Sequence, residues 1–159
     1  MILYHGTTYN RFKKICTNQC IKITTKELSP YDCEGYYSTK EGFVHLTNNE
    51  YVALDFANRC WSQDNMSADG RLLVVMKVDI DDAKLVLDEF ENIEGTSTIE
   101  STCYKTDIDI PLNKIESVSY FAFSSFDKCC EFYNSRKNIE WDIINPEKIV
   151  WNGDWKQWY

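Results

Sequence analysis

A histidine and a glycine stand together near the start of this 159-residue chain, in the run Tyr4-His5-Gly6-Thr7. The apolar residues from Met1 to His5 predict a short strand that ends in a turn at Gly6-Thr7-Thr8. Glycine has no side chain, so the backbone at Gly6 can approach a ligand closely. A strand edge with one imidazole and backbone hydrogen-bonding groups can hold a flat amide and a neighbouring hydroxyl.

The second histidine follows about 40 residues later, in the run Gly42-Phe43-Val44-His45-Leu46-Thr47. Val44 and Leu46 alternate with His45, which predicts a strand whose two faces carry different side chains. If this strand and the first one are neighbours, we expect the rings of His5 and His45 to line one cleft together with Phe56.

A helix is expected directly after this strand. Thr47-Asn48-Asn49-Glu50 has the spacing of a capping box, which starts a helix. The helix should bury a stripe of residues at helical intervals. These residues are Val52, Ala53, Phe56, Ala57 and Cys60. Phe56 then either lines the site beside the two histidines or belongs to the core.

The remaining pattern predicts a single α+β domain spanning residues 1–159, because strands outnumber helices and no linker or repeat divides the chain. The expected elements are a helix at Asn10–Cys16 with Phe12, Ile15 and Cys16 inward, a doubly covered central strand at Arg71–Val78, strands at Ser101–Ile108 and Ile115–Ala122, a helix from Ser125 to Asn134, and a long loop at Thr24–Glu41. The C-terminal region is rich in aromatic residues, and we expect it to pack on the sheet or to present a surface for a protein partner. Its aromatic residues are Trp141, Trp151, Trp155, Trp158 and Tyr159.

Composition excludes several classes of function. The net charge of −8 disfavours an extended duplex-binding surface. A local basic patch is an alternative to a solvated face, and it would comprise Arg11, Lys13, Lys14, Lys22 and Lys26. No apolar run is long enough to span a membrane, and no signal peptide is visible. Seven cysteines without a CxxC pair indicate reduced thiols in the cytoplasm, and zinc ligands at finger-like spacing are absent.

Taken together, Tyr4-His5-Gly6-Thr7, the Gly42–Thr47 run and Ala53-x-x-Phe56-Ala57 resemble the histidine-tyrosine-glutamate branch of the ADP-ribosyltransferase superfamily, which includes diphtheria toxin, the poly(ADP-ribose) polymerases and the rifampin ADP-ribosyltransferases. The likeness covers residues 2–60, and the strand at 72–78 fits in order. It implies a split, mostly antiparallel sheet with a few short flanking helices. It also implies that NAD⁺ is a substrate, whose nicotinamide–ribose bond is cleaved.

The resemblance assigns a role to each matching residue. His5 would hydrogen-bond a ribose hydroxyl of NAD⁺, Gly6 would hold the nicotinamide carboxamide through its backbone, and Thr7 would support the turn. His45 stands where most of the family has a tyrosine that stacks on nicotinamide, and Phe56 stands where a second aromatic residue completes the sandwich.

A glutamate near the ribose stabilises the oxocarbenium-like transition state in this family. Here Glu100 is the first candidate for that catalytic carboxylate, with Glu91 and Glu94 as alternatives.

Two other functions remain open from the sequence. An RNA 2′-phosphotransferase shares the fold and carries histidine in a similar Val-His-Leu context, but it has arginine where this chain has Tyr4. A non-catalytic binding module could keep the fold and bind a partner through the aromatic C-terminal region. Small size and acidic charge suit a toxin-type or host-defence effector, and the acceptor of ADP-ribose, a macromolecule or a small molecule, is not indicated by any motif.

Overall fold

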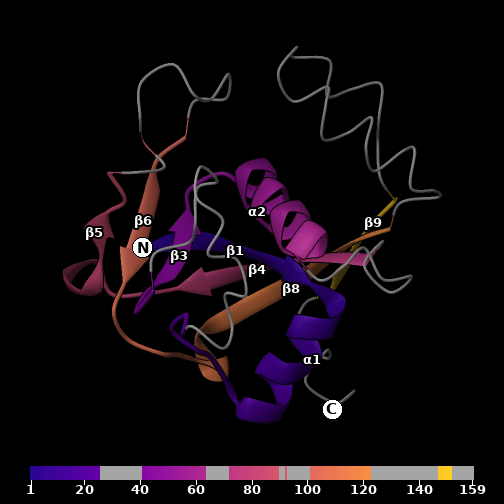
Figure 1. Cartoon of the computed structure of the whole chain (residues 1–159), viewed down its shortest axis with the longest axis horizontal. Coiled ribbons are helices and arrows are strands. Elements are labelled where there is room, and N and C mark those ends of the chain that lie inside the picture. The colour runs from indigo at the N-terminus through magenta and orange to yellow at the C-terminus, as the bar shows by residue number, and fades with distance from the viewer. Residues whose placement is uncertain (26–40, 64–71, 90–91, 93–100, 123–146, 152–159) are drawn as a thin grey trace.

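The computed structural model describes residues 1–25, 41–63, 72–89, 92, 101–122 and 147–151. Within these ranges seven strands form one sheet in the order β5-β6-β3-β1-β4-β8-β9, and each neighbouring pair is antiparallel (Figure 1). The strands are β1 (Ile2–Thr8), β3 (Val44–Thr47), β4 (Leu72–Asp79), β5 (Val86–Leu87), β6 (Cys103–Thr106), β8 (Ile115–Ala122) and β9 (Glu147–Trp151). With the helices α1 (Tyr9–Asn18) and α2 (Glu50–Gln63), the domain is α+β, as predicted.

Strand β1 is longer than the sequence indicates. It pairs with β4 along its whole length, from Ile2 opposite Asp79 to Thr8 opposite Leu73. The predicted turn at Gly6–Thr8 is therefore wrong, because the apolar residues of β4 provide these three residues with pairing partners far away in the chain. Thr8 ends the strand and caps α1, since its Oγ1 accepts a hydrogen bond from the backbone N–H of Arg11 at 3.4 Å.

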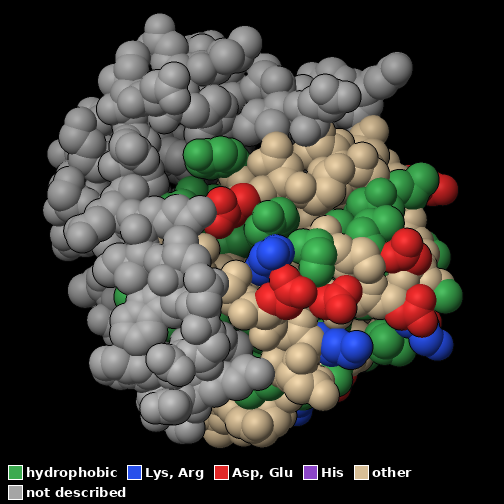
Figure 2. Space-filling model, turned by 180° about the vertical axis from the view of Figure 1, so that it is seen from behind, with side chains coloured by type: hydrophobic (Ala, Val, Ile, Leu, Met, Phe, Trp, Pro, Cys, Tyr) green, Lys and Arg blue, Asp and Glu red, His purple; other side chains and the backbone are tan. Residues whose placement is uncertain are grey.

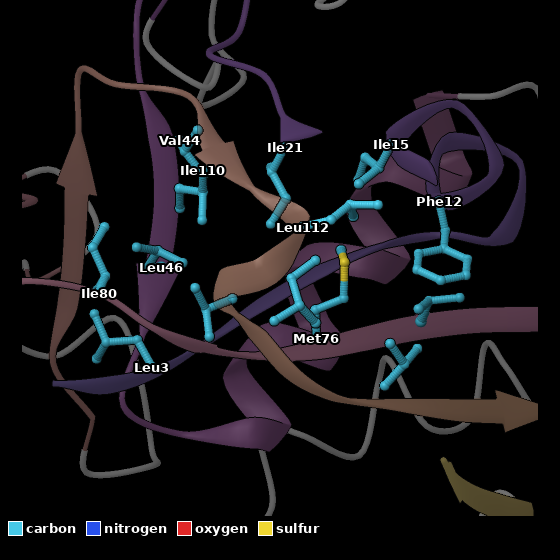
Figure 3. Packing of buried hydrophobic residues seen from close by; sticks show 14 of the residues in the cluster. Leu3, Phe12, Ile15, Ile21, Val44, Leu46, Met76, Ile80, Ile110 and Leu112 are labelled. Carbon is cyan, nitrogen blue, oxygen red and sulfur yellow. The ribbon is translucent and has the colours of Figure 1, made fainter. Parts of the chain in front are cut away.

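The two helices cover opposite faces of the sheet (Figure 1). On the α1 face, Phe12, Ile15 and Cys16 are buried as predicted. They join a cluster that includes Leu3, Leu46 and Met76 from three sheet strands (Figure 3). A small second sheet of β2 (Cys20–Ile21) and β7 (Ile110–Pro111) closes this cluster with Ile21 and Ile110 (Figure 3).

The other face of the sheet is covered by α2, whose start and buried stripe differ from the prediction. Asn49, rather than Thr47, caps the helix: its Oδ1 accepts from the N–H of Tyr51 at 2.9 Å and of Val52 at 3.4 Å. Ala53, Leu54 and Ala57 are fully buried. Val52, Phe56 and Cys60 are only partly buried.

Most other predicted strands are present. The apolar run forms β4, which lies between β1 and β8 and is buried on both faces, and the strand at Ile115–Ala122 is β8. The strand predicted at Ser101–Ile108 is shorter, since β6 spans Cys103–Thr106. In the C-terminal region Trp151 lies in β9, which joins the sheet by pairing with β8. The predicted loop at residues 26–40, the helix at 125–134 and the other aromatic residues of this region lie outside the described residues.

The described surface mixes charges of both signs. Figure 2 shows aspartate and glutamate side chains interspersed with lysine and arginine on the face opposite to the view of Figure 1. Among the described residues, Cys16, Cys20, Cys60 and Cys103 form no disulfide bond. No helix in the described ranges is both long and apolar enough to span a membrane.

A buried threonine in β6 predicts a stabilising substitution. The Oγ1 of Thr106 is buried and has no hydrogen-bond partner, whereas the Oγ1 of buried Thr47 accepts from the N–H of Asn49 at 3.3 Å. Thr106→Val removes an unsatisfied polar group at nearly constant volume, so it should raise the free energy of unfolding by about 1 kcal/mol. The matched change Thr47→Val should lower it by about 1 kcal/mol. Urea denaturation of both variants measures this, and an equal loss in the two would show that the Thr106 hydroxyl is satisfied.

Candidate functional site

The two strands that carry the histidines are neighbours in the sheet, as the sequence analysis required. They are joined much more weakly than the strands around them. Only Tyr4 and Thr47 are in register between β1 and β3, whereas seven residue pairs join β1 to β4 and four join β3 to β6. The two strands therefore separate just beyond Tyr4 and Thr47, at the position of His5 and His45.

The direction of each backbone group in β1 follows from the hydrogen bonds at its start. The amino nitrogen of Met1 donates to the carbonyl of Ile80 at 2.6 Å, and the N–H of Ile80 donates to the carbonyl of Met1 at 3.0 Å. In an antiparallel ladder such reciprocal pairs alternate with residues whose backbone groups point the other way. Odd-numbered residues of β1 therefore bond β4, and the N–H and C=O of Tyr4 and Gly6 point toward β3.

The same reasoning applies to β3. The N–H of Asn48 donates to the carbonyl of Thr102 at 3.1 Å on the β6 side, so the backbone groups of Thr47 and His45 point toward β1. After Tyr4 with Thr47, the next pair in the ladder would be Gly6 with His45. That pair does not form, and the backbone N–H and C=O of Gly6 face the separation between the strands.

A side chain replaces the missing backbone pair. The carbonyl of His45 accepts a hydrogen bond from Nδ1 of His5 at 2.9 Å. Before β3, the carbonyl of Phe43 accepts from the N–H and the Oγ1 of Thr24, at 3.0 Å and 2.9 Å. The carbonyls of His45 and Phe43 thus have hydrogen-bond partners outside the backbone of β1. These contacts keep β1 and β3 apart.

The bond to a carbonyl determines the tautomer of His5. A carbonyl can only accept, so Nδ1 of His5 carries the hydrogen and Nε2 of the neutral ring has a lone pair. Burial lowers the pKa of His5 to about 4, aided by the positive charge of Arg11, although the hydrogen bond to the carbonyl of His45 acts in the opposite direction. At neutral pH His5 is therefore uncharged and presents Nε2 as an acceptor.

The two imidazoles lie on opposite faces of the sheet, so the expectation that both rings line one cleft is wrong. His5 pairs with Met76 and shares the α1 face with Leu3. His45 alternates with Val44 and Leu46, which belong to that same cluster, so its ring lies on the α2 face. The two histidines are linked by the carbonyl of His45, which accepts from the ring of His5. The two rings lie on either side of the sheet, where the strands separate.

Gly6 lies directly beneath α2. A Cβ at this position would be 1.6 Å from the carbonyl oxygen of Ala53 and 3.0 Å from the backbone nitrogen of Ala57. Glycine is therefore required for helix packing, while its N–H and C=O lie in the plane of the sheet. Thr7, the next residue, is buried and pairs with Val74 on the α1 face.

Phe56 lies on the flank of α2 away from β4 and β8. Glu50 and Leu54 mark the other flank, because the carboxylate of Glu50 accepts from Ser119 Oγ of β8 at 3.2 Å and Leu54 packs in the cluster with Leu73 of β4. At 100° per residue, Phe56 is turned well away from both. It is partly buried and lies on the same face of the sheet as His45.

The carboxylate of Asp88 is a functional candidate that no pattern in the sequence indicates. Asp88 Oδ2 lies 2.6 Å from Nδ1 of His45, and the side chains of these residues are only 2% and 14% exposed. No motif or spacing relates the two residues, since they meet across β6, which lies between β5 and β3 in the sheet. Glu100, Glu91 and Glu94, the predicted catalytic carboxylates, lie outside the described residues.

Comparison of the chain with protein-family models and with curated protein sequences finds no match. The argument for function therefore depends on the geometry of this site and on the motif resemblance.

Gly6→Ala should destabilise the protein severely. The added methyl group meets helix backbone, which cannot move away as a flexible side chain could, so we expect a loss of more than about 3 kcal/mol in the free energy of unfolding. Gly42→Ala is the control, because Gly42 has open space around it and only its φ of 85° is unfavourable, a cost of about 1 kcal/mol. Equal losses in denaturant titrations would contradict the close approach of β1 and α2.

Neutral His5 makes stability depend on pH. Its pKa is about 4 in the folded protein and 6.5 in the unfolded chain, so the unfolded chain binds a proton first as pH falls. The stabilisation is fully present above pH 6.5 and is lost as pH falls toward 4, by about 3 kcal/mol in total. In His5→Asn the amide can donate to the same carbonyl but does not titrate. Between pH 7 and pH 4.5, wild type should lose about 2 kcal/mol more than this variant in urea denaturation, and parallel losses would show that His5 titrates normally.

Proposed function

We propose that this protein is an ADP-ribosyltransferase that cleaves the nicotinamide–ribose bond of NAD⁺ and transfers ADP-ribose to an acceptor, and that its sheet is of the ADP-ribosyltransferase type. The observation that carries the proposal is the separation of β1 from β3 at Gly6. The motif resemblance and the geometry at this position support the same ligand.

The backbone of Gly6 matches the carboxamide of nicotinamide. In a reciprocal antiparallel pair, one residue offers an N–H and a C=O side by side to a partner that offers the same two groups. A primary carboxamide also presents one C=O and one N–H in a plane. It can therefore bond the C=O and N–H of Gly6 in place of the backbone of His45, which does not pair with Gly6. This provides two hydrogen bonds to the leaving group without any conformational change in β1.

The surrounding side chains suit the rest of the nucleotide. Nε2 of His5 is an acceptor at neutral pH, as a bond from a ribose hydroxyl requires. On the α2 face, Phe56 and His45 would flank the nicotinamide ring. Bond cleavage leaves positive charge on the ribose, which a carboxylate stabilises, and Glu100 remains our candidate for that role.

The proposal predicts that the purified chain releases nicotinamide from NAD⁺, slowly even without an acceptor. His5→Ala should lower the rate by about 10²-fold, because it removes a hydrogen bond to ribose and also the bond that keeps the carbonyl of His45 from pairing with Gly6. Chromatographic measurement of nicotinamide at pH 7 tests this.

Thr106→Val serves as the matched control, since Thr106 lies on β6 and not on β1 or β3, and it should keep the wild-type rate. An inactive wild-type chain, or a His5→Ala variant as active as wild type, would refute the proposal.

A further inference from the structure

The pair of His45 and Asp88 is the strongest feature of the site that the motif resemblance does not explain. A ring that only stacks on nicotinamide needs no partner for its nitrogen atoms. Here Nδ1 of His45 is 2.6 Å from a carboxylate that is almost wholly buried. Burying a carboxylate is costly, and such pairs contribute little to stability in general.

Asp88 is held rigidly beside His45. Its N–H donates to the carbonyl of Cys103 at 3.0 Å, and its own carbonyl accepts from the N–H and the Nδ2 of Asn92, at 3.1 Å and 2.8 Å. The side chain of Asn92 also bonds both backbone groups of Cys103, donating to the carbonyl at 2.7 Å and accepting from the N–H at 2.8 Å. These bonds attach Asp88 and Asn92 to β6, the strand that pairs with β3.

The carboxylate orients the imidazole. Because an ionised carboxylate only accepts, Nδ1 of His45 carries the hydrogen, and Nε2 of the neutral ring has the lone pair. A buried carboxylate that holds a histidine in this tautomer also stabilises the imidazolium formed when Nε2 takes up a proton. The pair of His45 and Asp88 therefore allows Nε2, at the edge of the His45 ring, to take part in proton transfer.

We infer that His45 is the general base for ADP-ribosyl transfer, that Asp88 is its positioning residue, and that the acceptor is a hydroxyl group. This inference rests on the proposed function. The bond between C1′ of the ribose and nicotinamide breaks, and nicotinamide leaves as a neutral molecule with the bonding electrons. The acceptor oxygen bonds C1′, and its proton passes to Nε2 of His45 and then to solvent.

The choice of a hydroxyl acceptor follows from the chemistry of the base. A carboxylate acceptor is already ionised near neutral pH and needs no base. A hydroxyl group must lose a proton as it bonds carbon, and a histidine with Nε2 unprotonated is suited to receive it.

The test uses the full chain, NAD⁺ and two probe acceptors, methanol and azide. Methanol needs deprotonation and azide does not. With methanol, Asp88→Asn and His45→Phe should each lower kcat for methyl ADP-ribose formation by about 10²-fold. KM for NAD⁺ should stay within about twofold, because both variants keep an aromatic ring at position 45. With azide, both variants should regain nicotinamide release to within about threefold of wild type.

Two results would overturn the inference: unchanged methanol transfer in both variants, or an equal loss with azide, which would mean that the pair is only structural. His45→Phe keeps the test decisive if Asp88→Asn does not fold. Nicotinamide release by wild type separates the two proposals, since its absence refutes the proposed function, whereas its presence with either result above refutes this inference alone.

Discussion

The hydrogen bond from Nδ1 of His5 to the carbonyl of His45 is the contact on which the rest of the site depends. It uses the acceptor that the N–H of Gly6 would otherwise bond, and so a side chain ends the β1–β3 ladder after one pair. The same bond leaves Nε2 of His5 as an acceptor, and the backbone N–H and C=O of Gly6 have no register partner in β3. Three properties of the site thus follow from one contact of 2.9 Å.

The sheet can tolerate this break because β1 is secured elsewhere. Seven register pairs join it to β4, which is itself buried between β1 and β8. On one face α2 approaches so closely that only glycine fits at position 6, and on the other face Leu3 packs in the main cluster. The backbone of Gly6, which has no register partner in β3, is therefore fixed by its neighbours, as the proposed binding site requires.

Local patterns in the sequence predict much of this fold and only part of the site. The apolar runs that became β4 and β8, and the buried face of α1, depend on residues close together in the chain. The extension of β1 through Gly6–Thr8 was missed because its partner, β4, lies far away in sequence. The helix cap moved from Thr47 to Asn49 because both residues can cap and local spacing does not choose between them. Adjacent strands were predicted correctly, but the opposite faces of His5 and His45 follow from register, which no local pattern encodes.

Asp88 shows the same limit for catalytic groups. Its role depends on β5, β6 and β3 lying side by side, and on an asparagine that ties the turn to β6. A motif comparison that transfers residues one by one finds the histidine and cannot find its partner. The geometry, rather than the resemblance, suggests that position 45 acts through the edge of its ring as well as through its face.

The backbone amide of Gly6 offers the most direct test of the central claim. In ¹H–¹⁵N correlation spectra of the full chain titrated with nicotinamide, this amide should shift downfield to saturation and its hydrogen exchange should slow, because its N–H gains an acceptor. A Gly6 amide that is already protected before ligand is added, or that does not move at saturating nicotinamide, would contradict the account.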